Sequence, residues 1–292
     1  MKKKVIFSGV ATALITPFKS GKIDYTALSE IIEFQIRAGI DALVIGGTTG
    51  EAATLSDYER DKLYSFAAEA VRGRVPLILG TGSNDTKKAV KYTARAKHLG
   101  ADAALCVTPY YNKGTENGIV NHYQKIANCA DLPIILYNVP SRTGVNLSIN
   151  AIKALAKEEN ICAIKEASDS TDRLIELSSF HSSLALYAGN DSQIYTALSL
   201  GGMGVISVLS NATPCDVLEI TNAFWRGDEK ASIDMQRKLL KRINTVFLET
   251  NPTPIKYAMH IMGYCAPDVR LPLSLPCEKT RAIIENEFST DS

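Results

Sequence analysis

Residues 133–165 read PIILYNVPSRTGVNLSINAIKALAKEENICAIK and contain the unit from which we expect the fold to be built. Short apolar runs form its two ends, at 133–140 and 162–165, and a helical segment separates them. Each run is almost continuously hydrophobic, which is typical of a parallel strand that is buried on both faces. The stretch therefore predicts one strand–helix–strand unit of an α/β protein.

Six further apolar runs of similar length bring the number of expected strands to eight. In chain order the expected strands are 9–16, 42–47, 76–80, 103–109, 133–140, 162–165, 184–189 and 204–210. The segments between them are expected to be helices, and between residues 63 and 71 the apolar residues recur at helical spacing. Because open, doubly wound sheets commonly have about five or six strands, eight units favour a closed (β/α)8 TIM barrel.

After about residue 225 the strands stop, and the remaining chain is helical in pattern. Apolar residues at helical spacing occur in 229–249, 254–263 and 278–288. We therefore expect residues 1–224 to form a catalytic barrel and residues 225–292 to form a small all-helical C-terminal domain. No low-complexity linker separates the two parts, so we expect the C-terminal helices to pack against the barrel.

The composition is that of a globular protein without a polyanionic partner. Of the 292 residues 46% are hydrophobic and 22% are charged, and 32 basic against 31 acidic side chains leave a net charge of +1. This balance gives no electrostatic reason to expect nucleic acid or an acidic membrane as a partner. No run of about 18 or more apolar residues is present, so we expect no membrane-spanning segment.

The N-terminus and the cysteines favour a cytoplasmic location. The first 18 residues superficially resemble a signal peptide, but small and polar residues interrupt the apolar run, and we expect a strand there. The six cysteines are widely spaced without a CxxC motif, which is typical of small buried side chains in a reducing compartment. The four histidines show no metal-ligand spacing, so no metal site is expected.

In a TIM barrel the chemistry lies at the carboxyl ends of the strands, and Lys165 is the most informative side chain at such an end. There its ammonium would be partly desolvated, which lowers its pKa and frees the amine to attack a carbonyl. The alternative is a structural lysine paired with the adjacent Glu166. Successive side chains of a strand point to opposite faces, so we expect Glu166 to face away from Lys165.

Two other strand ends supply groups that suit a small keto acid. The turn GGTTGE (46–51), which contains Thr48 and Thr49, offers amides and hydroxyls to a carboxylate or a phosphate. Tyr137 either handles protons near an imine or is a packing ring. Arg142 either binds a second carboxylate or is solvated. Together with Lys165, these residues predict Schiff-base aldolase chemistry.

The stretches that hold these residues carry a family resemblance. The chain resembles the pyruvate-dependent Schiff-base lyases, and most closely the dihydrodipicolinate synthase family, in five stretches: GGTTGE (46–51), TPYYNK (108–113), YNVPSRTG (137–144), IKEAS (164–168) and AGND (188–191). The similarity runs along essentially the whole chain, and the combination is far more specific than any single motif. It implies a TIM barrel with a helical C-terminal domain, and neither a metal nor a cofactor.

The resemblance also implies roles at the pyruvate site. Lys165 would form the imine with pyruvate, whose carboxylate would lie on Thr48 and Thr49. Thr49, Tyr137 and Tyr111 would form a proton relay, in which Tyr111 crosses into the site of a neighbouring subunit. A homo-oligomer is therefore implied, a tetramer built as a dimer of dimers.

For the second substrate, the resemblance implies that Arg142 binds L-aspartate 4-semialdehyde. Ile206 would contribute its backbone carbonyl to the site. The product would be 4-hydroxy-tetrahydrodipicolinate, which belongs to the diaminopimelate and L-lysine pathway.

Other assignments stay open at the level of sequence. N-acetylneuraminate lyase and the 2-keto-3-deoxy sugar-acid aldolases share the lysine, the tyrosine and the Gly-Thr turn, whereas Arg142 and the tyrosine pair at 110–111 favour the synthase. A non-catalytic barrel is a second alternative, although no expected catalytic residue is missing. A phosphate-binding barrel is a third, because GGMGVIS (201–207) lies at the last strand, where such barrels bind phosphate. A monovalent cation near Asp191 is also left open.

One group of positions departs from the family pattern. Feedback-inhibited members carry histidines after GGTTGE, and an acid on the next helix, which help to hold L-lysine. The matching positions here are Ala52, Asp57, Arg60 and Lys88, whereas Asn84 and Tyr110 are retained. Lys88 places a positive charge where a cationic effector needs a carboxylate, and like charges about 4 Å apart repel by about 1–4 kcal/mol. We expect L-lysine to inhibit weakly or not at all.

Overall fold

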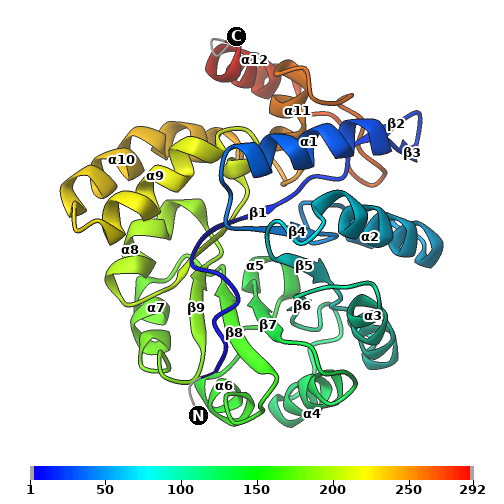
Figure 1. The fold of residues 1–292 in the computed structure, drawn as a ribbon, viewed down its shortest axis with the longest axis vertical. Coiled ribbons are helices and arrows are strands. Elements are labelled where there is room, and N and C mark those ends of the chain that lie inside the picture. Colours follow the sequence, from blue (N-terminus) through cyan, green and yellow to red (C-terminus); the bar gives the residue numbers. More distant parts are fainter. Residues whose placement is uncertain (1–2, 290–292) are drawn as a thin grey trace.

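The structure is a computed structural model, and it describes residues 3–289. Eight parallel strands form a closed barrel (Figure 1). In chain order they are β1 (Gly9–Ala13), β4 (Ala42–Ile45), β5 (Leu77–Gly80), β6 (Ala103–Val107), β7 (Ile134–Asn138), β8 (Ile161–Glu166), β9 (Ala185–Ala188) and β10 (Gly204–Ser207). The first strand pairs with both β4 and β10, which closes the barrel and confirms the predicted fold.

The eight predicted strands are all present, but several are shorter than expected. The first ends at Ala13 and the last at Ser207, because the apolar residues that follow them belong to loops and to a 3-10 turn. Outside the barrel, β2 (Phe18–Lys19) and β3 (Lys22–Ile23) form an antiparallel ribbon that the sequence pattern does not reveal. Strands of two residues are too short to show alternation.

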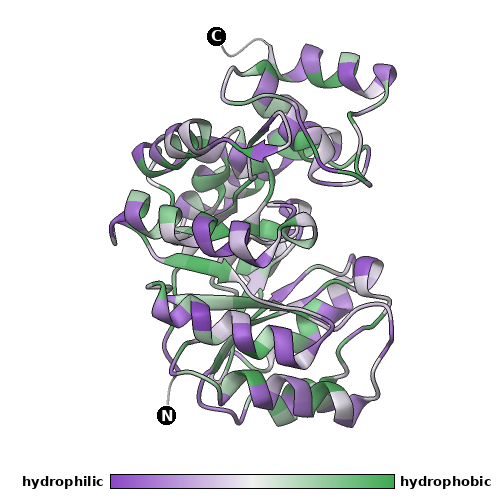
Figure 2. Ribbon diagram, turned by 90° about the vertical axis from the view of Figure 1, so that its right-hand side faces the viewer, coloured by the Kyte–Doolittle hydropathy of each residue, from purple (hydrophilic) through white to green (hydrophobic). Residues whose placement is uncertain are grey.

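Helices surround the barrel (Figure 1). They are α1 (Tyr25–Arg37), α2 (Asp57–Val71), α3 (Thr86–His98), α4 (Glu116–Ala127), α5 (Pro140–Thr143), α6 (Ile149–Leu155), α7 (Thr171–Ser178), α8 (Ile194–Ser199) and α9 (Pro214–Trp225), with 3-10 turns η1 (Ala52–Thr54), η2 (Asp191–Gln193) and η3 (Leu209–Asn211). Hydrophilic and hydrophobic residues alternate along the outer helices (Figure 2), as expected for helices with one face on the barrel and one in solvent.

The C-terminal part consists of α10 (Glu229–Thr245), α11 (Thr253–Ile261) and α12 (Glu278–Phe288), which confirms the helical pattern predicted after residue 225. Helix α10 packs against α8 and α9, and α11 packs against α12. The C-terminal helices therefore pack against the barrel, as expected. The division into two domains at residues 224 and 225 stays a prediction, because α10 continues the packing of α9.

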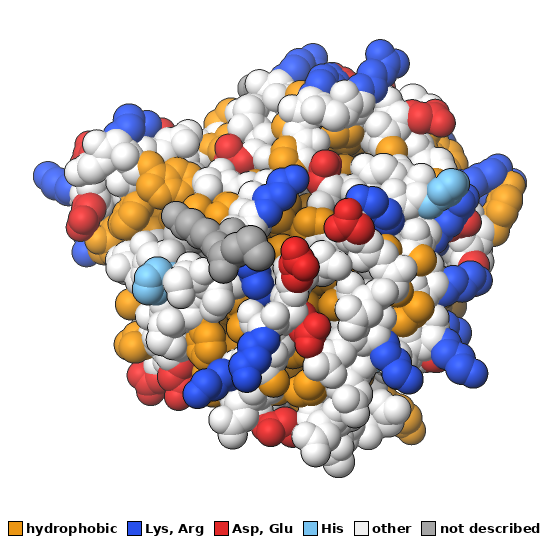
Figure 3. Space-filling view, turned by 60° about the horizontal axis from the view of Figure 1, so that its bottom comes forward, with side chains coloured by type: hydrophobic (Ala, Val, Ile, Leu, Met, Phe, Trp, Pro, Cys, Tyr) orange, Lys and Arg blue, Asp and Glu red, His pale blue; other side chains and the backbone are white. Residues whose placement is uncertain are grey.

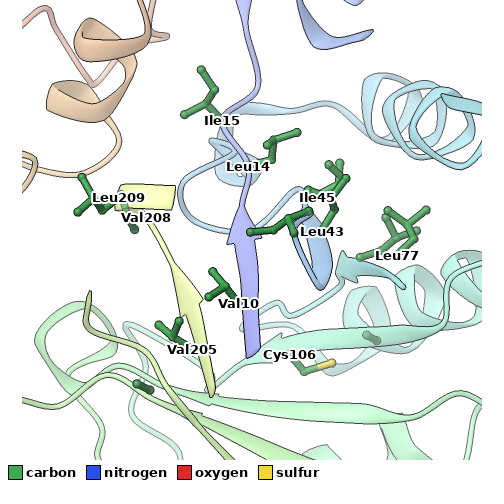
Figure 4. Close-up of a cluster of buried hydrophobic side chains, with 14 of the residues drawn as sticks. Val10, Leu14, Ile15, Leu43, Ile45, Leu77, Cys106, Val205, Val208 and Leu209 are labelled. Atoms are coloured by element: carbon green, nitrogen blue, oxygen red, sulfur yellow. The ribbon is translucent and has the colours of Figure 1, made fainter. Parts of the chain in front are cut away.

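The core has two layers, which the strand alternation separates. On β4, Leu43 and Ile45 belong to the cluster between the strands and the outer helices, part of which Figure 4 shows. The intervening Val44 points to the other side and belongs to the cluster inside the barrel. Side-chain direction on each strand therefore decides which residues reach the barrel axis.

The glycines of 201–207 serve close packing. Gly204 has φ +138°, and a Cβ there would lie 1.8 Å from the carbonyl oxygen of Gly9 on the neighbouring strand. A Cβ on Gly202 would lie 2.6 Å from the carbonyl oxygen of Ala197. These contacts favour the packing interpretation of this stretch over the phosphate-binding one.

The surface agrees with the near-zero net charge. Basic and acidic side chains are interspersed over the face shown in Figure 3. The six cysteines are free thiols. Within residues 3–289, no helix has the length and apolar character needed to cross a bilayer.

Candidate active site

Lys165 lies inside the barrel near the carboxyl end of β8. Its neighbours Ala163 and Ala167 belong to the interior cluster, whereas Ile164 belongs to the outer one, so strand alternation turns Lys165 toward the barrel axis. Only 4% of its surface is exposed. The strand continues for one residue beyond it, to Glu166, so Lys165 is not the last residue of the strand as the sequence suggested.

Glu166 faces away from Lys165, as predicted. Its two carboxylate oxygens accept hydrogen bonds from Asn138 Nδ2 at 3.0 and 2.9 Å, and Oε1 also accepts one from the backbone N–H of Ser168 at 2.9 Å. The guanidinium of Arg173 lies 3.6 Å from Oε2. Glu166 is therefore satisfied on the outer side of the strand, and the structural pairing of Lys165 with Glu166 is excluded.

The environment of Lys165 favours a neutral amine. Burial lowers the pKa of Lys165 to about 8, Arg142 acts in the same direction, and the carboxylate of Asp191 opposes both. Lys165 Nζ lies 4.5 Å from the centre of the Tyr137 ring. An amine with a pKa near 8 has a substantial neutral fraction at physiological pH and is a good nucleophile for a carbonyl.

Tyr137 is brought to Lys165 by the register of the sheet. The two residues are paired across β7 and β8, so their side chains enter the barrel at the same level. Burial raises the pKa of Tyr137, while Arg142 and the Thr48 hydroxyl act in the opposite direction. The phenol is therefore protonated at neutral pH and can donate a proton.

The turn after β4 presents the two threonines. Gly46 has φ +67°, and a Cβ there would lie 2.4 Å from the hydroxyl of Tyr64, so the turn requires glycine. Thr49 is 97% buried, and its Oγ1 accepts a hydrogen bond from Asn251 Nδ2 at 3.0 Å. The chain thus fixes one of the two hydroxyls that were predicted to hold a carboxylate.

Asn251 is the site residue that sequence reasoning missed. Besides its bond to Thr49, its backbone carbonyl accepts a hydrogen bond from Arg142 Nη2 at 2.9 Å. It lies in the loop between α10 and α11, and 5% of its surface is exposed. Pro252 marks the end of this loop in the sequence, and Pro254 lies in the first turn of α11. Nothing local indicates that the loop reaches the barrel.

A cavity of about 360 Å³ brings most of the predicted site residues together. Its lining includes Thr48, Thr49, Tyr137, Arg142 and Lys165. Two predicted residues are not part of this lining. The side chain of Ile206 is fully buried in the interior cluster, and Tyr111 is 88% exposed with φ +75°. The structure of one chain therefore tests neither the role of the Ile206 carbonyl nor that of Tyr111.

A second cavity, of about 540 Å³, adjoins the first and shares Thr48, Tyr137 and Arg142 with it. Its lining contains all six positions considered for an effector: Ala52, Asp57, Arg60, Asn84, Lys88 and Tyr110. The Asp57 carboxylate already accepts hydrogen bonds from Lys91 Nζ and from the Tyr92 hydroxyl, both at 2.7 Å. The Asp57 carboxylate is therefore already occupied, and the expectation of weak L-lysine inhibition stays a prediction.

Histidine, cysteine and acidic side chains do not form a metal site in the part of the chain that the structure describes, since no three of them come together there. The buried His122 places Nδ1 2.9 Å from the Thr86 hydroxyl. The expectation that the reaction needs no metal or cofactor stays a prediction.

Fold and site together define an aldolase-type lyase: a TIM barrel with a desolvated lysine and a protonated tyrosine at the carboxyl ends of adjacent strands. Comparison with known proteins narrows this class. The model of the dihydrodipicolinate synthetase family matches residues 6–288, and this chain belongs to that family.

Individual relatives agree with the family assignment. The chain is 43% identical over 284 residues to the 4-hydroxy-tetrahydrodipicolinate synthase of Alkaliphilus oremlandii, covering 97% of this chain and 98% of the relative. Crystal structures of dihydrodipicolinate synthases from Thermotoga maritima and, in complex with pyruvate, from Acinetobacter baumannii each superpose with a TM-score of 0.94 at 39% identity, covering 97% of both chains.

Proposed function

We propose that this protein is a 4-hydroxy-tetrahydrodipicolinate synthase, which condenses pyruvate with L-aspartate 4-semialdehyde in the diaminopimelate and L-lysine pathway. The observation that carries the proposal is the buried amine of Lys165, with its pKa lowered to about 8, facing a cavity beside Tyr137 and the Thr48–Thr49 turn. The family assignment supports the same reaction.

The proposed reaction begins with attack of the neutral Lys165 amine on the ketone of pyruvate. The resulting carbinolamine takes up a proton, loses water and leaves a cationic imine. Loss of a methyl proton then gives the enamine, whose carbon forms a bond to the aldehyde carbon of the semialdehyde. The aldehyde oxygen takes up a proton and becomes the hydroxyl of the product, and the cationic imine is regenerated. Attack of the semialdehyde's own amino group on the imine carbon closes the ring and releases Lys165.

The residues around the cavity suit the two carboxylates and the proton transfers. Thr48 and Thr49 would hold the carboxylate of pyruvate. The pyruvate complex of the Acinetobacter baumannii relative supports pyruvate as the first substrate. Tyr137 would deliver and accept protons within reach of the imine. Arg142 would bind the carboxylate of the semialdehyde with its planar guanidinium, and the Ile206 carbonyl would complete the site.

Tyr111 would complete the proton relay of a neighbouring subunit. Its side chain is 88% exposed and lies outside the cavity of its own chain, which suits a residue that reaches into another copy. We therefore include a homo-oligomer in the proposal, a tetramer built as a dimer of dimers in the cytoplasm, acting without a metal or another cofactor.

Mixing two inactive variants tests the shared site. In a mixed dimer of Lys165→Ala and Tyr111→Phe chains, one site contains both Lys165 and Tyr111. Activity should therefore return on mixing, up to about one quarter of the original for random exchange of subunits. Mixtures that stay inactive after verified subunit exchange would contradict the role of Tyr111 across the interface.

The choice of aldehyde tests the function itself. The protein is incubated with pyruvate and, separately, L-aspartate 4-semialdehyde, N-acetylmannosamine or glyceraldehyde, and products are followed by mass spectrometry. We expect turnover with the semialdehyde and at most trace condensation with the other two. Faster turnover of either sugar aldehyde would instead assign the chain to the sugar-acid aldolases of the same superfamily.

A further inference from the structure

Asp191 is a buried carboxylate that the reaction sequence above does not use. It begins η2 shortly after β9, and its side chain lines the same cavity as Lys165. Only 1% of its surface is exposed, and its Oδ1 atom has no hydrogen-bond partner among residues 3–289. An unpartnered carboxylate oxygen is unfavourable in a buried site. A positive charge that arises in front of it is therefore strongly stabilised.

The carboxylate is held in place from two sides. Its Oδ2 atom accepts hydrogen bonds from the backbone N–H groups of Val208 and Leu209, at 3.0 and 3.1 Å, in the loop that follows β10. The backbone carbonyl of Asp191 accepts a hydrogen bond from Gln236 Nε2 of α10 at 3.0 Å. These bonds fix the orientation of the carboxylate and leave Oδ1 as its free oxygen.

Lys165 lines the same cavity and is the cation whose charge lowers the pKa of this carboxylate. The other ionisable side chains lining the cavity are Tyr137, Arg142 and Asp169. Asp169 is exposed, and its Oδ1 accepts a hydrogen bond from Asn190 Nδ2 at 3.1 Å. Arg142 is bound to the Asn251 carbonyl.

The pKa shifts of the two groups agree with this geometry. Burial is the largest cause that raises the pKa of Asp191. Hydrogen bonding by the Ser207 side chain and by the Leu209 and Val208 amides lowers that pKa, and the charge of Lys165 lowers it further. Conversely, Asp191 raises the pKa of Lys165 against the effect of burial. Tyr187, beside Lys165 on β9, donates its hydroxyl to the Phe7 carbonyl and has a raised pKa, so it adds no charge at neutral pH.

We propose that Asp191 is the counter-ion of the cationic imine nitrogen on Lys165, an electrostatic positioning residue that does not itself exchange a proton. This inference rests on the proposed function. The nitrogen is neutral in the carbinolamine, cationic after the uptake of a proton and the loss of water, and neutral again in the enamine once a methyl proton has left. A fixed anion stabilises the cationic species selectively.

The test compares two variants by borohydride trapping. Asp191→Asn retains an oxygen for the Val208 and Leu209 amides but removes the charge, and Asp169→Asn removes the exposed carboxylate of the same cavity as a matched control. Each protein is reduced in the presence of pyruvate from about pH 6 to about pH 10. Intact-protein mass spectrometry then measures the fraction of Lys165 that is trapped.

Loss of the counter-ion should change both the pH dependence and the yield. Since a nearby opposite charge shifts a pKa by about 1–3 units, the midpoint for Asp191→Asn should move to lower pH by about one unit or more, and the adduct at saturating pyruvate should fall about tenfold. The midpoint for Asp169→Asn should stay in place. If Asp191→Asn does not fold, Asp191→Ser carries the same expectation, because its hydroxyl can still accept a backbone N–H.

Two results would overturn the inference. One is an Asp191→Asn variant with an unchanged midpoint and an unchanged yield of adduct. The other is a lower yield of adduct together with a lower melting temperature and an unchanged pH midpoint. A purely structural role of Asp191 would lower the yield and the melting temperature but would leave the midpoint in place. Failure of the unsubstituted protein to form any adduct would instead contradict the proposed function itself.

Discussion

Lys165 and Lys256 are two buried lysines in very different surroundings. Both lie over an aromatic ring, with Nζ 4.5 Å from the ring centre of Tyr137 and 4.1 Å from that of Phe18, respectively. Burial lowers the pKa of both. Lys256, on α11, forms an ion pair with Glu51 of the GGTTGE turn. Lys165 forms no hydrogen bond or ion pair of its own within residues 3–289.

The comparison shows what separates a reactive lysine from a structural one. Burial alone does not do so, because Lys256 is fully buried. A carboxylate in direct contact keeps the proton on the amine and occupies it, whereas an amine that opens into a cavity without such a partner can lose its proton and attack a carbonyl. Lys256 therefore ties the C-terminal helices to the barrel, and Lys165 is left for chemistry.

Replacement of Lys165 should have the largest effect and tests whether this lysine is reactive rather than structural. Lys165→Met should lower kcat by about 1,000-fold or more, because loss of a covalent nucleophile in other enzymes lowers kcat by up to about 10⁶-fold. The melting temperature should change little, since the Lys165 amine forms no direct hydrogen bond or ion pair that the substitution would break, and Asp191 keeps its hydrogen bonds to the Val208 and Leu209 amides. Steady-state kinetics measure the change in kcat, and thermal unfolding measures the change in melting temperature. A lower melting temperature would mean that Lys165 is structural after all.

Replacing Tyr137 by Phe should have the next largest effect. Loss of a general acid–base group typically lowers kcat by about 10²–10⁴-fold, while the ring under Lys165 is preserved. The imine should still form, more slowly, because the amine is intact. Measurement of kcat and of the trapped adduct separates these two steps. Unchanged kcat would make Tyr137 a packing ring only.

Replacing Lys256 should affect stability, in contrast to the replacement of Lys165, which should affect kcat. Lys256→Met leaves the Glu51 carboxylate buried without its partner, which lowers the free energy of unfolding by about 3–5 kcal/mol. Urea unfolding measures the change. The double variant Glu51→Gln, Lys256→Met is the matched control and should recover part of the loss, because neither charge remains. Equal stability of the single and double variants would contradict the account of a buried pair.

The pH dependence should show the lowered pKa of Lys165 directly. Only the neutral amine attacks pyruvate, and its fraction rises with pH through a pKa of about 8. Two units below that pKa about one amine in a hundred is neutral, so kcat/KM for pyruvate at about pH 6 should be roughly 100-fold below its plateau. A rise of kcat/KM with its midpoint near pH 10.5 would instead indicate that Lys165 has the pKa of an ordinary exposed lysine.

The smallest effect is expected at a third, exposed lysine, Lys88, in the second cavity. Its charge repels a cationic effector, and Arg60 and the occupied carboxylate of Asp57 offer no replacement for an acid. We expect L-lysine at about 1 mM to inhibit the protein by less than half. This corresponds to a dissociation constant above about 1 mM, that is, to a binding free energy weaker than about 4 kcal/mol. Half-inhibition at lower concentrations in a steady-state assay would refute this expectation.

Eight continuous apolar runs and the residues at their ends were enough to predict the barrel and the importance of Lys165, because the length and apolar character of a buried strand are local properties of the sequence. Alternation explains why Glu166 turns away. The partners of the site residues were harder to predict. Asn251 donates a hydrogen bond to Thr49, and Glu51 accepts one from Lys256. The two residues of each pair are about 200 positions apart in the sequence, and no local pattern encodes such contacts.

Reduction with sodium borohydride in the presence of pyruvate, followed by peptide mass spectrometry, tests the central claim most directly. The account predicts a reduced pyruvyl adduct on Lys165 and none on Lys256, although both amines are buried. An adduct on another lysine, or none at all on folded protein, would contradict it.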